Sequence, residues 1–438
     1  MRKSYPTETV TLKAIIGGGQ AIGTLESGKK IMVWGGLPGE TVIVQPTKRK
    51  RSYLEGVVAE VLTPSSSRIK PLDPESYLST SPWQIMAFDY EQQMKSQLID
   101  EAFRLHQVNL PQPVTIKTND VQWRYRNKVE FSWYSQEDPQ TGKDSLDLAF
   151  FRRGSKGKIT LEDSHLLPRP MVDLARQVRD LLRKKSVSAR SLKTLLIRTN
   201  QAGDCVWQLY IKQPTCDFLS QDDIESLGAL GGEVIYSDPR SPASRISQRL
   251  ISCGQNYLED MVLGVPFRYA TEGFFQVNIP VYEMALEEMR QWIQADKTTL
   301  DLYAGVGSIG LTIGGNNCQL VEINQHAVRE MRQNIKALGK SATAVLAASE
   351  LALDYITDDK TVIVDPPRAG LHAAVIDKLN HETPERIIYL SCNPVTQARD
   401  VAMLLEKYKI AINVGYNFFP RTPHIEHLVV LERLPIGR

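Results

Sequence analysis

The sequence predicts an α/β protein of three domains: an N-terminal β-barrel, a central α+β domain and a C-terminal Rossmann-like, doubly wound sheet. Residues 7–62 form short β-branched runs separated by glycine turns, which is typical of a small barrel. From about residue 271, apolar strands alternate with helical patterns, as in a parallel sheet covered on both faces. A chain of 438 residues has room for three domains. We set their bounds at 1–64, 65–268 and 269–438.

The elements between the barrel and the sheet can be ordered along the chain. The segment 63–76 is rich in Pro and Ser and predicts a linker. A helix is expected at about 90–108, where it could pack on the C-terminal domain, because 91–105 has apolar residues at helical spacing. The rest of the central domain mixes strands with basic loops, and a further helix is expected at about 169–185.

Charge and cysteine usage narrow the class of protein. Residues 1–200 carry a net charge of +10 and the remainder −8, so the N-terminal half either binds a polyanion or has a solvated charged face. Five dispersed cysteines without a CxxC pair argue against disulfides and structural zinc, and leave room for one catalytic thiol. Without a signal peptide or an apolar run of membrane-spanning length, we expect a cytoplasmic protein.

The first motif with chemical meaning is 300-LDLYAGVGSIGL-311, where the opening strand of the sheet turns into a helix. Gly305 and Gly307 would let the backbone approach a ligand, and Glu322, at the end of the next strand, is placed to bind ribose hydroxyls. The third glycine usual for dinucleotides is missing, and Asp301 at the turn better suits S-adenosylmethionine. The alternative is a helix start that is simply packed tightly on its strand.

Two later strands end in reactive residues. Asp365 precedes two prolines, which fix an extended loop without N–H donors, and Cys392 follows the next strand, so both would lie at one edge of the sheet. A helix that begins after Pro394 would lower the pKa of the Cys392 thiol. Taken alone, Asp365 could mark a strand-terminating turn, and Cys392 could be a small buried hydrophobe.

Glu426, between His424 and His427 at the start of the last strand, either is a surface acid or faces the same pocket. A thiol and two carboxyls at one edge suit methylation of uracil. Carbon C5 of uracil becomes nucleophilic once a thiolate adds to C6, and a base must then remove the C5 proton. Cys392 would be the nucleophile and Glu426 the base, while Asp365 would position the ring through N3–H. The target base must also leave its stack.

Taken together, SCNPxTxARD, DPPRAGL, DLYxGxG and 273-GFFQVN-278 closely resemble the RNA (uracil-5-)-methyltransferases, which make 5-methyluridine in ribosomal or transfer RNA. The resemblance covers essentially the whole chain. It implies a SAM-dependent enzyme that acts on RNA, with 23S ribosomal RNA ahead of transfer RNA, and it gives Cys392 and Glu426 the roles of nucleophile and base. The cofactor-binding positions that it implies are Gln276, Tyr303, Gly305, Glu322 and Asp365.

The resemblance extends to the N-terminal half. The barrel resembles a TRAM domain, an RNA-binding module of the oligonucleotide-binding type, which fits the basic charge balance. The segment 124-RYRNKVEF-131 resembles the family's central domain, so Arg126 and Lys128 are expected to face RNA. Phe275 and Asp365 complete the substrate-binding residues that we expect.

Two departures from the family pattern matter. Many members hold a [4Fe–4S] cluster on four cysteines, but residues 75–86 contain none, and Ser164 stands where the fourth would lie. Cluster ligation needs thiolates, so we predict no cluster and no other metal. The family usually has an acid near Ala348 that holds adenine; here Ser349 or Glu350 would have to substitute.

Three functions compete at this point. The first is a monomeric SAM-dependent RNA uracil-C5 methyltransferase. The second is a catalytically inert RNA-binding or ribosome-assembly factor of the same fold, suggested by the missing cluster and the altered adenine site. Methylation of a small molecule or a protein fits poorly with two basic, RNA-type domains.

Overall fold

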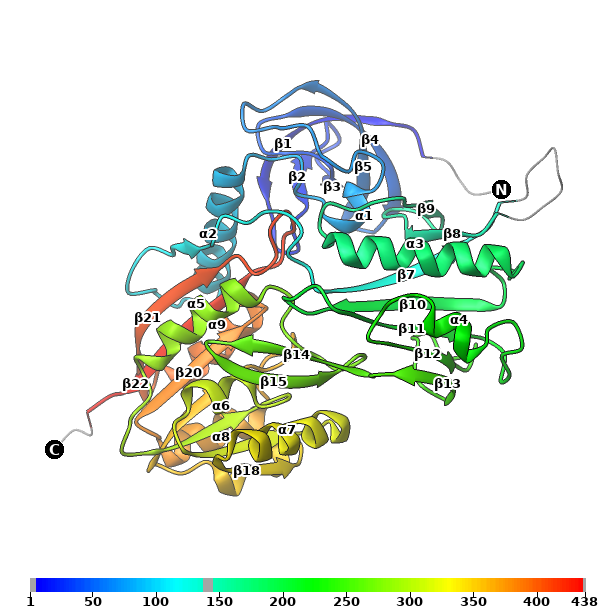
Figure 1. Cartoon of the computed structure of the whole chain (residues 1–438). Helices are drawn as coiled ribbons and strands as arrows, with labels where there is room; N and C mark the ends of the chain where they lie inside the picture. Colours follow the sequence, from blue (N-terminus) through cyan, green and yellow to red (C-terminus); the bar gives the residue numbers. More distant parts are fainter. Residues whose placement is uncertain (1–4, 137–144, 436–438) are drawn as a thin grey trace. The chain divides into compact units, whose positions relative to one another are not determined.

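The computed structural model describes residues 5–136 and 145–435, which fall into two compact units (Figure 1). Unit 1 consists of Met1–Phe88 and Val121–Leu258, and unit 2 of Asp89–Asp120 and Glu259–Arg438. Unit 1 therefore combines the barrel with most of the predicted central domain. Unit 2 begins its long segment at Glu259, somewhat before the predicted boundary after residue 268.

The first five strands of unit 1 close into a barrel in the order β1-β2-β3-β5-β4. Inward side chains such as Val33 and Val44 are fully buried, whereas their neighbours along the strand are not, as the period of two requires. Closure removes the free strand edges on which another chain could pair. The strands are β1 (Glu8–Ile15), β2 (Ala21–Thr24), β3 (Lys30–Trp34), β4 (Thr41–Arg49) and β5 (Tyr53–Thr63).

The predicted linker after the barrel is tied to it. The buried carboxylate of Glu40 accepts hydrogen bonds from the guanidinium of Arg68 and from the backbone N–H groups of Leu37 and Ser65. Burial alone would raise the pKa of Glu40, but the bonds from Arg68 and the two amides outweigh it and lower that pKa. The segment thus has a fixed place on the barrel.

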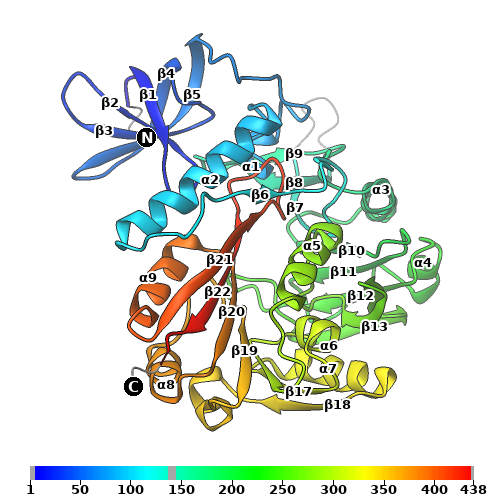
Figure 2. The same ribbon diagram turned by 90° about the vertical axis from the view of Figure 1, so that its left-hand side faces the viewer.

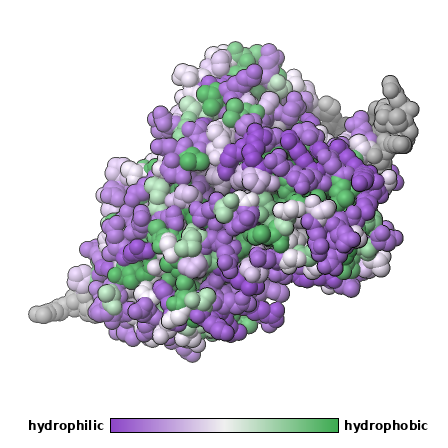
Figure 3. All heavy atoms as spheres, viewed as in Figure 1, coloured by the Kyte–Doolittle hydropathy of each residue, from purple (hydrophilic) through white to green (hydrophobic). Residues whose placement is uncertain are grey.

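The rest of unit 1 is a seven-stranded sheet in the order β13-β12-β11-β10-β7-β8-β9, in which β11 and β12 run parallel. Helix α3 (Arg169–Lys184) packs its apolar side against one face through Met171, Val178 and Leu182, while its outer side is mainly hydrophilic (Figure 3). Two short helices, α1 (Tyr77–Thr80) and α4 (Gln221–Glu225), complete the unit. The strands are β7 (Lys128–Tyr134), β8 (Asp147–Phe151), β9 (Lys158–Thr160), β10 (Leu192–Thr199), β11 (Cys205–Ile211), β12 (Gly231–Tyr236) and β13 (Gln248–Gly254).

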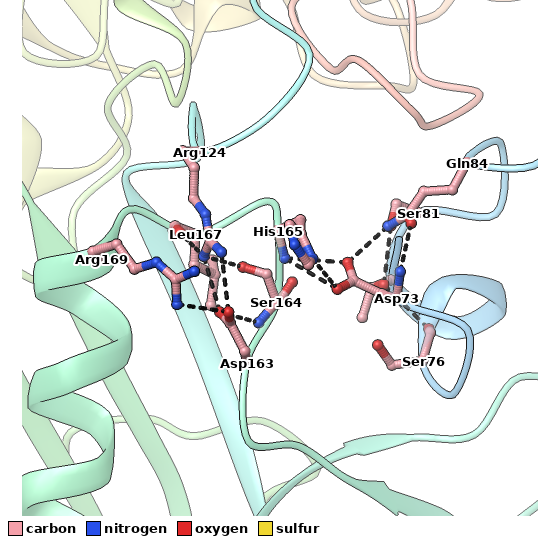
Figure 4. A network of polar contacts seen from close by, with 11 residues as sticks. Asp73, Ser76, Ser81, Gln84, Arg124, Asp163, Ser164, His165, Leu167 and Arg169 are labelled. Atoms are coloured by element: carbon pink, nitrogen blue, oxygen red, sulfur yellow. Dashed lines mark hydrogen bonds and ion pairs between the residues drawn. The ribbon is translucent and has the colours of Figure 1, made fainter. Parts of the chain in front are cut away.

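A polar network, hereafter the Asp73–Asp163 network, joins the segments 73–84 and 163–169 of unit 1 (Figure 4). Asp73 binds the side-chain amide of Gln84 at 2.8 Å and the ring Nδ1 of His165 at 2.7 Å. Arg124 donates to both carboxylate oxygens of Asp163, at 2.9 and 3.0 Å. These are the segments on which the family resemblance places cluster cysteines in other members.

Unit 2 contains the predicted doubly wound sheet, with the order β18-β17-β16-β19-β20-β22-β21-β6. The first five strands are parallel, and β22 is antiparallel to β20 and β21. Short β6 (Ile116–Lys117) was not expected; it pairs with β21 as an added edge strand. The others are β16 (Thr298–Leu302), β17 (Asn317–Glu322), β18 (Ser341–Leu346), β19 (Lys360–Val364), β20 (Arg386–Ser391), β21 (Tyr408–Tyr416) and β22 (Glu426–Arg433). The hairpin of β14 (Tyr257–Val262) and β15 (Val265–Ala270) precedes them.

Helices cover both faces of this sheet. Figure 2 shows α8 (Ala373–Glu382) and α9 (Pro394–Leu404) on one face, and α5 (Ile279–Arg290), α6 (Ser308–Ile313) and α7 (Gln325–Leu338) on the other. Helix α2 (Phe88–Leu105) packs in unit 2: the buried ammonium of Lys95 donates to Asn417 just after β21 and pairs with Glu91. Among the described residues, every helix is too short or too polar to span a bilayer.

Candidate active site

The predicted catalytic residues meet at one edge of the unit 2 sheet. Asp365 follows β19 and Cys392 follows β20; since these strands are parallel neighbours, their carboxyl ends lie side by side. Strand β22 runs antiparallel to β20 with Ser391 opposite His427, so Glu426 at its start reaches the same edge. The structure therefore brings together the thiol and both carboxyls that the sequence singled out.

The electrostatics of this edge differ from the expectation for the thiol. Burial, followed by the nearby carboxyls of Glu426 and Asp365, raises the pKa of Cys392 to about 12. The helix start at Pro394 was expected to lower this pKa, and that prediction is wrong because two acids and burial oppose it. Only Arg368 acts noticeably the other way among the side chains near the thiol.

Both carboxyls also hold their protons more tightly than usual. Burial raises the pKa of Asp365 to about 7, and burial together with Asp365 raises that of Glu426 well above its ordinary value. Glu426 is 5% exposed, so water screens it little. In its ionised form, a carboxylate with a raised pKa is a stronger proton acceptor than an ordinary glutamate, which suits a general base.

Arg368, in the loop after Asp365, was not singled out from the sequence. Its guanidinium lies 3.0 Å from the ring of His424, and its backbone carbonyl accepts hydrogen bonds from Asn393 and Thr396 at the start of α9. The loops after β19 and β20 are thus fastened together beside Cys392. An arginine directly after Asp-Pro-Pro was the available sequence signal.

Two buried side chains, Asp400 and His427, support these loops from the interior of the domain. Asp400 of α9 accepts hydrogen bonds from Leu371 N–H at 2.7 Å and from the hydroxyl of Tyr389 at 2.8 Å. The ring of His427 is hydrogen-bonded to Gln397 at 2.7 Å and packs edge-on against Phe103. Burial lowers the pKa of His427 to about 3, so this ring is neutral and supports the backbone next to Glu426.

Asp365, whose carboxyl is close enough to Cys392 and Glu426 to raise their pKa values, also lines a pocket with about 330 Å³ of unfilled space, part of it open to solvent. The pocket contains three of the other predicted cofactor residues, Gln276, Tyr303 and Gly305. Gly305, which lines the pocket, and Gly307 have positive φ angles of 57° and 87°, a backbone conformation that favours glycine. The full lining is Phe274, Phe275, Gln276, Tyr282, Tyr303, Ala304, Gly305, Val306, Ser308, Ile309 and Asp365.

The other residues predicted to bind the cofactor are hydrogen-bonded to residues that line this pocket. Glu322, at the end of β17, accepts hydrogen bonds from the N–H groups of Gly305 and Asn324, which orients its carboxylate toward the glycine loop. Ser349, which could replace the missing adenine acid, donates to the hydroxyl of Tyr303 at 2.7 Å and lies 3.3 Å from Glu350. This donor set, of carboxylate, hydroxyl and glycine backbone, fits the ribose and amino-acid ends of SAM.

The substrate-binding residues are distributed differently. Phe275 is buried and stacks on Tyr269, with ring centroids 4.1 Å apart, whereas its neighbour Phe274 is 70% exposed at the pocket. Phe274 is thus the more accessible of the two aromatic side chains, and no signal in the sequence separates it from Phe275. Arg126 and Lys128 lie in unit 1; Arg126 donates to the backbone of Lys128, whose ammonium is 3.4 Å from Glu130.

No group of three or more metal-ligating side chains is gathered anywhere in residues 5–136 and 145–435. At the expected cluster position, Ser164 contributes its backbone carbonyl to Arg124 instead. The prediction that the protein holds no cluster stays a prediction.

Comparisons with known proteins agree with this site. The family model described as tRNA (uracil-5-)-methyltransferase matches residues 89–434. An uncharacterized RNA methyltransferase of Enterococcus faecalis is 28% identical, and the match covers 91% of this chain and 91% of the relative. Another, of Lactiplantibacillus plantarum, is also 28% identical, and the match covers 92% of each chain. The solved tRNA (uracil-54, C5)-methyltransferase of Pyrococcus abyssi, in complex with S-adenosyl-L-homocysteine, shares the fold with a TM-score of 0.79. It is 20% identical and covers 97% of this chain and 99% of its own.

The family match spans nearly the whole of unit 2 and the seven-stranded sheet of unit 1, and it includes each strand-end motif described above. Cofactor pocket, reactive edge and relatives thus agree on one activity. The chain belongs to the tRNA (uracil-5-)-methyltransferase family and is a SAM-dependent enzyme that methylates uracil C5 in RNA.

Proposed function

We propose that the protein methylates one specific uridine through a covalent bond between Sγ of Cys392 and C6 of the uracil ring, and that 23S ribosomal RNA is the first candidate substrate. The observation that carries this proposal is the meeting of Cys392, Asp365 and Glu426 at one edge, beside the pocket. Methylation of a nitrogen or oxygen atom would need no such thiol, because a lone pair attacks directly.

The roles of Cys392 and Glu426 follow from the charge that each step of the reaction requires. As uracil binds, the thiol of Cys392 loses its proton to water and the thiolate adds to C6; the C5–C6 π electrons move toward C5 and the C4 carbonyl, giving an enolate whose C5 is nucleophilic. SAM supplies the methyl group that C5 attacks. Glu426 then takes the proton from C5, the C5–C6 double bond re-forms, and the C6–S bond breaks to release the thiolate.

Asp365 acts on the uracil ring and Arg368 acts on the thiolate that attacks it. Since the pKa of Asp365 is near 7, its ionised form is available to accept a hydrogen bond from uracil N3–H. Arg368 favours the thiolate form of Cys392 electrostatically, which opposes the effect of the two carboxyls. Phe274, exposed at the pocket, is placed to pack on the extruded base.

A trapping experiment tests the chemistry. Incubation with tritiated SAM and RNA that contains 5-fluorouridine should yield a stable protein–RNA adduct, because fluorine replaces the C5 proton that the base would have to remove. Cys392→Ala should give no adduct, while Cys216→Ala, at a half-buried cysteine of unit 1, should give the wild-type amount. The proposal fails if wild-type protein gives no adduct or if Cys392→Ala still does.

Transfer RNA is the second candidate substrate, favoured by the name of the family and by the activity of the Pyrococcus abyssi enzyme. An inert RNA-binding factor remains the third; calorimetric titration with SAM separates it, because an inert factor would not bind. Mapping 5-methyluridine in ribosomal and transfer RNA from cells with and without the gene decides between the first two. A cytoplasmic location and a monomeric state stay predictions.

A further inference from the structure

Phe151 is an exposed aromatic residue on the β8–β9 hairpin of unit 1. Its neighbour Phe150 points to the other side, where it stacks on Phe131 with ring centroids 5.3 Å apart and packs against the apolar core. By alternation, Phe151 faces away from that core and is 68% exposed. A single exposed apolar side chain is common on protein surfaces, so the meaning of this ring depends on the residues around it.

One cation lies close to this ring, and two more belong to the same hairpin. Lys158, the cross-strand partner of Phe151, places its ammonium 5.3 Å from the ring centroid and is anchored by a hydrogen bond to the carbonyl of Trp133. The hairpin turn adds the exposed residues Arg152 and Lys156. The exposed ring is therefore part of a hairpin that carries these three cations.

The hairpin also brings together two basic segments that are distant in the sequence. Arg153 fastens it to the barrel, with its guanidinium 4.1 Å from the ring of Trp34 and hydrogen bonds to Leu78 and Ser79. Gly154 packs so closely that a side chain there would lie 2.9 Å from Val57 and 3.3 Å from Thr47. Thr47 directly precedes the exposed basic run 48-KRKR-51, hereafter the basic turn 48–51, which consists of the last two residues of β4 and the first two of the turn to β5.

We propose that the hairpin surface, made of Phe151, Arg152, Lys156, Lys158 and the turn 48–51, binds a single-stranded stretch of RNA. One unpaired base stacks on Phe151, and the cations on either side contact the phosphates. An exposed aromatic ring inside a basic strip is the composition that binds single strands, since every base has a π face and every linker is anionic. The proposal rests on RNA being the substrate, and it places a recognition site for unpaired nucleotides outside the active site.

Binding measurements on the full-length protein without SAM test the stacking. The probe is a fluorescein-labelled, 12-nucleotide single-stranded RNA of mixed A and U, followed by fluorescence anisotropy. Phe151→Ala should weaken binding about tenfold, as for loss of one stacked base, and Phe151→Leu should weaken it as much. Phe151→Trp should bind at least as tightly as wild type. Leu230→Ala, at another exposed apolar residue of unit 1, should change nothing.

Salt dependence separates the ring from the cations. Lys156→Ala should reduce the slope of log K against log salt by about 0.7, the value for one phosphate contact in a single strand, while Phe151→Ala should leave the slope unchanged. On a duplex of the same sequence, Phe151→Ala should have no effect because paired bases cannot stack. The inference is overturned if Phe151→Ala or Phe151→Leu binds the single strand like wild type. It is also overturned if Phe151→Ala weakens the duplex equally, or if Lys156→Ala leaves the slope as it was.

These results are separable from the methylation proposal. Cys392→Ala should bind the probe RNA like wild type, because the hairpin surface does not use the thiol. If Phe151 contributes to binding as expected but wild-type protein forms no 5-fluorouridine adduct, the covalent mechanism falls and the hairpin surface stands. If the adduct forms and Phe151 contributes nothing, the reverse holds.

Discussion

Carboxyl groups in two polar clusters of this protein have opposite pKa shifts. In the Asp73–Asp163 network, hydrogen bonds from Arg124 hold the pKa of Asp163 down at about 2. At the reactive edge of unit 2, burial raises the pKa of Asp365 to about 7 and that of Glu426 well above its ordinary value. The nearby cation, Arg368, is exposed and only partly offsets that burial.

The difference shows what each cluster is for. A carboxylate that accepts two hydrogen bonds from one guanidinium is held in its ionised form, and it stabilises the fold by joining two segments of the chain. Two carboxyls and a thiol held together with one exposed arginine are a cost to folding, which is expected where protons have to move. If the comparison is right, substitutions in the first cluster should alter stability, and substitutions in the second should alter rates.

The largest effect should come from Glu426→Gln. Without a base at this position, C5 keeps its proton after methyl transfer, so turnover should fall by about 10²–10⁴-fold. The covalent Cys392 adduct should still form on ordinary RNA and should now accumulate, which denaturing gel electrophoresis with tritiated SAM would detect. Glu432→Gln, on the same strand but paired with Arg386, is the matched control and should turn over normally. Loss of activity without any accumulated adduct would contradict the assigned role.

In the Asp73–Asp163 network, Arg124→Met should mainly affect stability. The change removes two bonds to Asp163 and two to the carbonyls of Ser164 and Leu167, and leaves Asp163 with Arg169 as its cation. We expect the free energy of unfolding to fall by about 2–3 kcal/mol, measured by urea denaturation. Arg240→Met, which breaks a pair between an exposed arginine and the partly exposed Asp238, should leave the free energy of unfolding unchanged. An unaltered stability for Arg124→Met would mean that the network is incidental.

The pH dependence of stability sharpens the same point. Asp163 titrates near 3.8 in the unfolded chain and near 2 when folded, so its contribution is complete above about pH 4 and is lost as the pH falls towards 2. The shift is equivalent to at most about 2 kcal/mol, because the side chain is partly exposed. Asp163→Asn should therefore be less stable than wild type at pH 7, and the difference should shrink at pH 3 and below. A difference that is constant with pH would count against a charged Asp163.

The sequence was sufficient to predict which side chains meet at the reactive edge where they follow strands that are consecutive and parallel. Asp365 and Cys392 could be placed together because β19 and β20 are neighbours in both sequence and sheet. Glu426 was harder, because its place depends on β22 inserting between β20 and β21, which strand order alone does not dictate. Strand β6 pairs with β21 although it lies far from it in the sequence. With only two residues, it is too short to show a periodic pattern.

Properties set by neighbours in space escaped the sequence. The pKa of Cys392 was predicted to fall because the adjacent helix start is visible in the sequence, whereas the carboxyls that raise it come from other loops. The choice between Phe274 and Phe275 depends on Tyr269 covering one of them. The basic turn 48–51 and the hairpin at Phe151 could be seen separately in the sequence, but their contact through Gly154 could not.

The smallest expected effect concerns the thiol itself. Arg368 is the nearby cation that favours the Cys392 thiolate, so Arg368→Met should raise the pKa of Cys392 still further and slow its alkylation by iodoacetamide, about two- to fivefold at pH 9. Because Arg368 is exposed, salt screens it, and the difference from wild type should narrow at 1 M salt. Mass spectrometry of the Cys392 peptide isolates this site from the other four cysteines. Arg329→Met, on the exposed side of α7, should leave the rate as it was. Faster alkylation in Arg368→Met would show that access to the thiol, rather than its charge environment, controls reactivity, and the electrostatic contrast between the two clusters would lose its clearest support.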